Sequence, residues 1–124
     1  MRKKILCVLL YLLMQSTYAG AHIPSVCPSL FAIKSVGFQS VKNTVYGWLG
    51  YTTCQYDTNI TWSLVSLIGT GFDNANQALQ KGNADLALLT HVQGPTQDED
   101  SENQWYCRYS GNGVIDILLS ASVD

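Results

Sequence analysis

The fold is decided by residues 104–121, whose sequence is QWYCRYSGNGVIDILLSA. The central SGNG, residues 110–113, predicts a tight turn, because Asn-Gly is the strongest short-range signal for a β-hairpin. Strand-forming residues flank this turn, so we expect strands at 104–109 and 114–121. One face of the second strand is apolar and is predicted to pack inward. Its residues are Ile115, Ile117, Leu119 and Ala121.

Three more strands are expected upstream of this hairpin. Residues 38–56 are rich in Val, Thr, Tyr and Trp, and they predict strands near 38–48 and 50–56. Gly47 and Gly50 indicate a bulge or a tight bend between them. A third strand is expected at 60–68, where apolar and polar residues alternate. Its core-facing residues would be Ile60, Trp62 and Leu64.

Two helices complete the set of expected elements. The first is expected at 28–34, where Pro28 suits a first helical turn. The second is expected from Asn74, a good N-cap residue, to about residue 89. An alternative ends this helix after Lys81, because Gly82 is a poor helix former, and places a strand at 84–92.

The order of these elements defines the expected fold class. It reads α-β-β-β-α-β-β, with the strands joined by short connections. We therefore predict an α+β domain, in which two helices pack on one face of an antiparallel sheet of about five strands.

The N-terminus has the three parts of a secretory signal peptide. A cationic start at residues 1–4 precedes an apolar block at 5–14 and a stretch of polar and small residues at 15–21. The apolar block is too short to span a bilayer, which takes about 20 residues. We expect cleavage after Ala21, with Ala19 as an alternative. The domains are then a signal peptide at 1–21 and one small domain at 22–124.

Processing changes both the location and the charge of the chain. We expect a secreted or periplasmic protein that has no stable membrane anchor after cleavage. The full chain carries a net charge of −2, but residues 22–124 have four Lys and Arg against nine Asp and Glu, a net charge of −5. An acidic chain lacks the basic surface that phosphate contacts need, which argues against nucleic acid as a partner.

The cysteines predict a cross-link in this oxidising compartment. Cys7 lies in the segment expected to be removed, which leaves Cys27, Cys54 and Cys107. Three cysteines allow one disulfide and one free thiol, with three possible pairings. We favour Cys27–Cys107, and Cys54–Cys107 between neighbouring strands is the competitor.

Several short motifs resemble a known family. They are the helix start at 27–29, the aromatic strands around Trp48 and Trp62, the helix with Ala78-Leu79, and the strand WYCRY at 105–109. Together they resemble a domain-of-unknown-function family of small, secreted, virulence-associated proteins from intracellular Gram-negative pathogens. Some members of that family are labelled haemin-binding. The resemblance therefore implies haem as a possible ligand, and it carries over no ligand residues.

No catalytic motif is present, so we expect a binding protein and not an enzyme. No nucleophile elbow occurs, and no catalytic signature surrounds any Cys. The candidate ligand-binding residues are Tyr46, Trp48 and Tyr106, because tyrosine can hold haem iron. The alternative is a protein-interaction module whose aromatic sheet face contacts an unknown protein partner.

The candidate metal ligands are His22 and His91. Cleavage after Ala21 would place the amine and imidazole of His22 at the N-terminus, where together they could chelate Cu(II). Cleavage after Ala19 would leave Gly20-Ala21-His22, a sequence with four nitrogens for a square-planar copper site. We expect His91 to be a further ligand for copper or haem if the fold brings it close.

Overall fold

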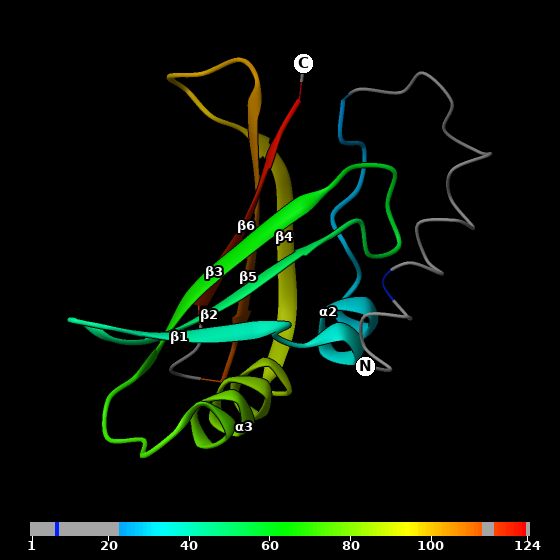
Figure 1. Ribbon diagram of the computed structural model, residues 1–124. Helices are drawn as coiled ribbons and strands as arrows, with labels where there is room; N and C mark the ends of the chain where they lie inside the picture. Colours follow the sequence, from blue (N-terminus) through cyan, green and yellow to red (C-terminus); the bar gives the residue numbers. More distant parts are fainter. Residues whose placement is uncertain (1–6, 8–22, 113–115, 124) are drawn as a thin grey trace.

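A six-stranded antiparallel sheet with two helices makes up the fold. The computed structural model describes Cys7, residues 23–112 and residues 116–123, and all elements named here lie in those residues (Figure 1). They are α2 (Leu30–Val36), β1 (Ser40–Thr44), β2 (Gly47–Cys54), β3 (Trp62–Gly69), α3 (Ala75–Leu86), β4 (Leu89–Gln97), β5 (Gln104–Gly111) and β6 (Asp116–Ser122). The predicted α+β class is confirmed, with one strand more than expected.

Both helices begin at polar caps that the sequence supplies. Ser29 Oγ accepts a hydrogen bond from the Ala32 N–H at 3.1 Å, so α2 begins at Leu30, two residues after Pro28. At α3, Asn74 Oδ1 accepts from the Gln77 N–H at 3.0 Å, as predicted for this N-cap. The Gln77 side chain in turn accepts from the Asp73 N–H at 2.9 Å, so two donors at the helix start are satisfied.

The helix α3 continues through Gly82 and ends at Leu86. The prediction of one continuous helix is therefore correct in kind, although the helix ends three residues earlier than expected. The alternative, a helix that ends after Lys81, is wrong. Gly82 is buried against the sheet, because a Cβ there would lie 2.8 Å from Ile68 Cδ1 and 2.9 Å from Phe38 Cδ2. The close approach of helix to sheet outweighs the low helix propensity of glycine.

The strand β4 was expected only in part, as the strand at 84–92 in the alternative to a continuous helix, and it lies further along the chain. It pairs antiparallel with β5 and forms one edge of the sheet. Most of its side chains are exposed, and Gly94 and Pro95 interrupt it, so it shows no alternation of apolar and polar residues. The turn between β1 and β2 lies at Val45-Tyr46, a few residues before the bend that was expected at Gly47 and Gly50. A register shift between Trp48 and Leu49 matches the expected bulge.

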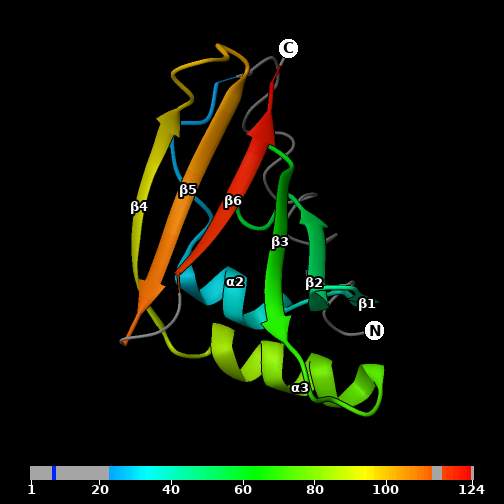
Figure 2. The same ribbon diagram turned by 90° about the vertical axis from the view of Figure 1, so that its left-hand side faces the viewer.

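The sheet has the strand order β1-β2-β3-β6-β5-β4. β6 is the last strand in the sequence, yet it lies between β3 and β5. It therefore joins the ladder β1-β2-β3 to the ladder β5-β4. Figure 2 shows β6 crossing between these two parts, with α2 and α3 beneath them.

The core lies between the inner face of the sheet and the helices. The predicted inward residues of the third strand region, Ile60, Trp62 and Leu64, are buried. Those of the last strand, Ile117, Leu119 and Ala121, are buried as well, while Ile115 lies outside the described residues. Ser110 and Gly111, which were expected in the turn at 110–113, lie instead at the end of β5. Gly113 and the expected start of the last strand at 114–115 lie outside the described residues.

The two disulfides join distant parts of the chain. Cys27 is bonded to Cys107, the pairing favoured above. The Tyr109 hydroxyl donates to the Pro28 carbonyl oxygen at 2.6 Å, which fixes the same segment to β5. Burial raises the pKa of Tyr109, so this hydroxyl keeps its proton. Disulfides are typical of chains that fold outside the cytoplasm.

Cys54, which the sequence analysis left unpaired, is bonded to Cys7 in this structure of the full chain. Cleavage of the expected signal peptide would remove Cys7 and leave Cys54 as a free thiol. The rest of that segment, both expected cleavage points and His22 lie outside the described residues. Within the described residues, no helix is both long enough and apolar enough to cross a membrane.

Candidate functional site

The strands β3 and β6 pair over only a short length. Their register joins Ser63 to Ser120 and Leu64 to Leu119, and no further pair follows. β3 nevertheless continues to Gly69, and β6 begins at Asp116. The two strands therefore diverge toward the end of the sheet where α3 lies, as Figure 2 shows. This divergence opens the sheet between its two ladders.

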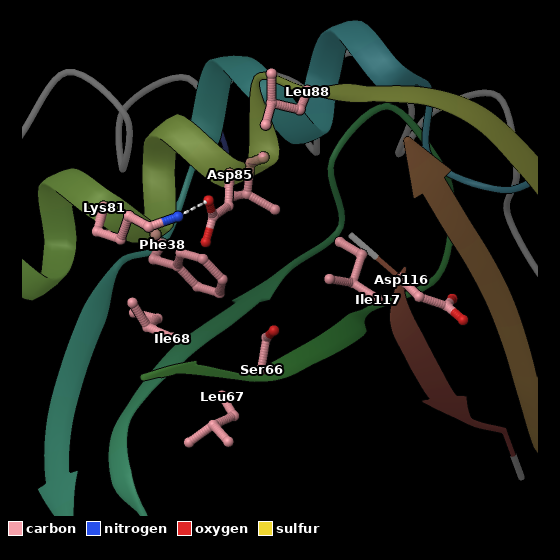
Figure 3. A pocket seen from close by; sticks show the side chains of 11 residues that line it. Phe38, Ser66, Leu67, Ile68, Lys81, Asp85, Leu88, Asp116 and Ile117 are labelled. Atoms are coloured by element: carbon pink, nitrogen blue, oxygen red, sulfur yellow. Dashed lines mark hydrogen bonds and ion pairs between the residues drawn. The ribbon is translucent and has the colours of Figure 1, made fainter. Parts of the chain in front are cut away.

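A cleft of about 360 Å³ occupies the opening (Figure 3). Its walls come from the two diverging strands and from α3, and the residues around it are mostly apolar with a few polar groups. They are Phe38, Ser66, Leu67, Ile68, Lys81, Gly82, Asp85, Leu86, Leu88, Asp116 and Ile117. The volume falls in the lower part of the range of small-ligand sites, about 300–1,000 Å³.

The Phe38 ring fixes the distance between helix and sheet at this cleft. It lies between Gly50 of β2 and Gly82 of α3, and a Cβ at Gly50 would come within 2.5 Å of its Cδ1 atom. The Phe38 N–H donates to Asn83 Oδ1 at 2.8 Å, which ties the segment just before β1 to α3. The ring fits because neither glycine has a side chain. A larger residue at either position would therefore push α3 away from β3.

The charged groups of the cleft are paired with each other or with a neighbour. Lys81 forms an ion pair with Asp85 one turn along α3, and the dashed line in Figure 3 marks it. Asp116 is paired with Arg108 across β5 and β6. The hydrogen bond from Arg108 holds the pKa of the Asp116 carboxyl below its ordinary value. The cleft therefore presents no charge without a partner among these four side chains.

Two of the sequence-predicted ligand residues lie at the β1–β2 edge of the sheet. Tyr46 is in the turn between these strands and is 78% exposed. Trp48 is half-buried on β2, opposite Asn43 of β1. Neither residue lines the cleft between β3 and β6.

The other two lie at the opposite edge. Tyr106 is half-buried on β5, and its hydroxyl is 3.5 Å from Asp98 Oδ2. His91 is exposed on the edge strand β4, and its Nδ1 lies 2.8 Å from Thr90 Oγ1. Two strands, β3 and β6, lie between β2 and the strand that carries Tyr106, and β5 lies in addition between β2 and the strand that carries His91. The structure therefore does not bring the four candidates into one site.

His91 lines a second, shallow depression of about 390 Å³. Its neighbours there are Val92, Gln93, Arg108 and Ser110. The cationic Arg108 is a poor neighbour for a metal ion. Over the part of the chain that the structure describes, no three His, Cys, Asp or Glu side chains are grouped to hold a metal.

The outer face of the sheet carries both aliphatic and aromatic side chains. Trp62 is fully buried on the inner face, and Trp105 shares that face with Ala121, its cross-strand partner. The outer face instead exposes Val65, Leu67 and Leu118, at 55%, 57% and 47%. Tyr51, the cross-strand partner of Val65, and Tyr106, the partner of Ser120, lie half-buried on the same outer face, so aromatic side chains contribute to it beside the aliphatic ones.

The residues of the cleft were not identified from the sequence. Ser66 and Ile68 belong to a strand that was predicted, yet nothing in the local sequence shows that its pairing with β6 stops after Leu64. Lys81 and Asp85 have the i, i+4 spacing of a helix-surface ion pair, which is the one local signal available. That signal indicates a solvated helix face as readily as the rim of a cleft.

These features define a class: a small, disulfide-bonded α+β domain whose sheet opens into a cleft covered by a helix. A family model matches residues 26–123, and the chain belongs to that family, the Domain of unknown function (DUF4949) family. No curated protein and no solved structure matches the chain.

Proposed function

We propose that the processed chain is an exported, non-catalytic binding protein whose ligand site is the cleft between β3, β6 and α3. The observation that carries the proposal is the early end of the β3–β6 pairing, which leaves a cleft of about 360 Å³ inside the sheet. Ligand sites are typically apolar and carry a few placed polar groups. Phe38, Ile68 and Ile117 supply the apolar part, and Ser66 supplies a hydroxyl.

The chemistry of the lining supports binding without catalysis. Ser66 is the hydroxyl in the lining, and a serine nucleophile needs a base beside it. The charged groups of the lining are all paired, Lys81 with Asp85 and Asp116 with Arg108. His91 lines the other depression, at the β4 edge of the sheet. No base therefore faces Ser66 among the residues that line the cleft.

Export is supported by the signal-peptide pattern at residues 1–21 together with the Cys27–Cys107 disulfide.

Haemin, which the family resemblance implies, is one candidate ligand for the test below. Tyr46 and Trp48 lie at one edge of the sheet, and Tyr106 and His91 lie at the other. A single haemin would therefore contact one of these pairs and not both.

The test is a titration of the oxidised, processed protein with haemin and, separately, with the neutral apolar dye Nile red. Ser66→Phe fills the cleft from the inner face of β3, and Ser63→Phe places the same ring on the outer face of that strand. We expect Ser66→Phe to weaken dye binding at least tenfold and Ser63→Phe to leave it within twofold. Equal binding by both variants would place the ligand site elsewhere and refute the proposal.

A further inference from the structure

We propose that the cleft binds an uncharged, extended peptide segment, which adds main-chain hydrogen bonds to the diverging edges of β3 and β6. This inference rests on the proposed function, because it names the ligand class of the same site. It depends on three features of the cleft: strand edges without a mutual partner, walls held in place by different neighbours, and charges that are already paired.

The first feature is the set of missing strand pairs. Continued antiparallel register after Leu64↔Leu119 would pair Val65 with Leu118, Ser66 with Ile117, and Leu67 with Asp116. None of these pairs forms. Each strand is still paired on its other side, β3 with β2 as far as Gly69 and β6 with β5 as far as Asp116. Each strand therefore has one satisfied edge and one edge that faces the cleft.

Main-chain groups on such edges need partners. Backbone N–H and C=O groups in folded proteins are almost always hydrogen-bonded, to protein or to water. A free strand edge is also the surface to which extended peptides add as a new strand. In this cleft two such edges face one common space, and they converge at Leu64 and Leu119. A peptide entering from the wide end meets main-chain donors and acceptors on both sides.

The second feature explains why the strands do not close on each other. The end of β3 is held by β2 on one side and by α3 from beneath, through the contact of Ile68 with Gly82. The start of β6 is held by β5 and by the Arg108–Asp116 ion pair. Because the two walls belong to different ladders of the sheet, the opening is set by packing outside the cleft.

The third feature selects an uncharged ligand. The carboxylate of Asp85 and the ammonium of Lys81 face each other, and Asp116 faces Arg108. An anionic head group would have to displace Asp85 from Lys81, and a cationic group would have to displace Arg108 from Asp116. Peptide main chain is polar and carries no net charge, so it matches strand edges without disturbing either pair. Apolar side chains on alternate residues of such a peptide would pack against Phe38, Ile68 and Ile117.

The first experiment tests the premise in the free protein. Amide hydrogen exchange is measured by NMR on the oxidised, processed chain. We expect alternate amides within Val65–Ile68, and those of β6 on the cleft side, to exchange at least a hundredfold faster than the amides of Leu64 and Leu119. Uniform protection along both strands would mean that the cleft closes in solution, which would overturn the inference.

The second experiment uses capped six-residue peptides in which Thr alternates with Val, Leu or Phe. Each is compared with a version that is N-methylated on alternate residues and so cannot make the same main-chain hydrogen bonds. We expect shift changes centred on Val65–Ile68 and on Ile117, and at least a tenfold loss of affinity on N-methylation. We expect Ser66→Phe to abolish binding, and Ser63→Phe to leave it within twofold.

The outcomes separate this inference from the proposed function. If Nile red binds in the cleft but no peptide binds at millimolar concentration, the peptide inference fails and the proposed function stands. If N-methylated peptides bind equally well, main-chain recognition is refuted while the site survives. If peptide shift changes fall on the outer face around Leu118, the inference also fails. If Ser66→Phe alters neither dye nor peptide binding, both proposals fail.

Discussion

Replacing Thr58 by valine tests how much one buried hydroxyl contributes to this fold. Thr58 is 1% exposed, in the loop before β3. Its Oγ1 accepts from Trp62 Nε1 at 3.1 Å and from the Ile60 N–H at 3.2 Å. It lies 2.9 Å from the carbonyl oxygens of both Gln55 and Ile60, either of which can take its proton. Valine keeps the shape of this side chain and removes every one of these hydrogen bonds.

The expected loss follows from the groups left without a partner. Trp62 is fully buried, and Ile60 is 7% exposed, so water does not readily replace the hydroxyl. A buried donor without an acceptor costs about 1–3 kcal/mol. Two such donors, less the gain from burying a methyl group, give a loss of about 3 kcal/mol in the free energy of unfolding. A domain of this size has a total of about 5–15 kcal/mol, so the variant would lose a large share of it.

Urea unfolding followed by tryptophan fluorescence measures this loss, and a thermal scan should show a melting temperature lower by about 15 °C. Thr53→Val is the matched control, because Thr53 is exposed on β2, and we expect a change within about 0.5 kcal/mol. Trp62→Phe removes the indole donor. The double variant Thr58→Val/Trp62→Phe should then be more stable than additivity predicts, by about 1–2 kcal/mol.

Two results would refute this reasoning. A loss below about 1 kcal/mol for Thr58→Val would mean that relaxation or water satisfies the donors. If the effects of Thr58→Val and Trp62→Phe were additive, the coupling energy between the two side chains would be zero, and their hydrogen bond would not contribute to stability.

Three further predictions concern other parts of the domain. Tyr109→Phe removes the hydrogen bond to Pro28 and should lower the free energy of unfolding by about 1–2 kcal/mol in urea; an unchanged midpoint would contradict it. If the signal peptide is removed, denatured but unreduced protein should take up one iodoacetamide, on Cys54, by peptide mass spectrometry; no uptake would show a bonded Cys54. Arg108→Gln should raise the pKa of Asp116, measured by NMR. Because the folded pKa is lowered, the stabilisation by this pair exists above the unfolded pKa of about 3.9 and is lost as the pH falls through the folded value. The two proteins should therefore differ less in stability at acid pH than at pH 7, and a constant difference would contradict this.

The elements with strong local signals could be predicted from the sequence. The β5–β6 hairpin follows from its turn residues and from the alternation of Ile117, Leu119 and Ala121. The start of α3 follows from the cap at Asn74. β4 was predicted only in part, as the strand at 84–92 of the alternative to a continuous helix, because an exposed edge strand needs no apolar face and Pro95 is tolerated there. The β4 segment is extended because it pairs with β5, and this long-range pairing leaves no pattern in the sequence of β4 itself.

The cleft could not be predicted for a different reason. It arises where β3 and β6, about fifty residues apart in the sequence, stop pairing after Leu64 and Leu119. No local pattern encodes the length of such a pairing, which depends on what holds each strand from outside. The same dependence on long-range strand order explains why the candidate ligand residues do not meet in one site. Tyr46 and Tyr106 look equivalent in the sequence, but the strand order places them at opposite edges of the sheet.

The central position of β6 has a consequence for how the sheet is completed. The final strand of the sequence, Asp116–Ser122, is the one that joins the two halves of the sheet. The ladders β1-β2-β3 and β5-β4 each keep one open edge, at β3 and at β5, until β6 pairs with both. Open edges favour association between chains. A chain that lacks β6 would therefore present two half-sheets with unpaired edges, and we expect it to aggregate more readily than the intact domain.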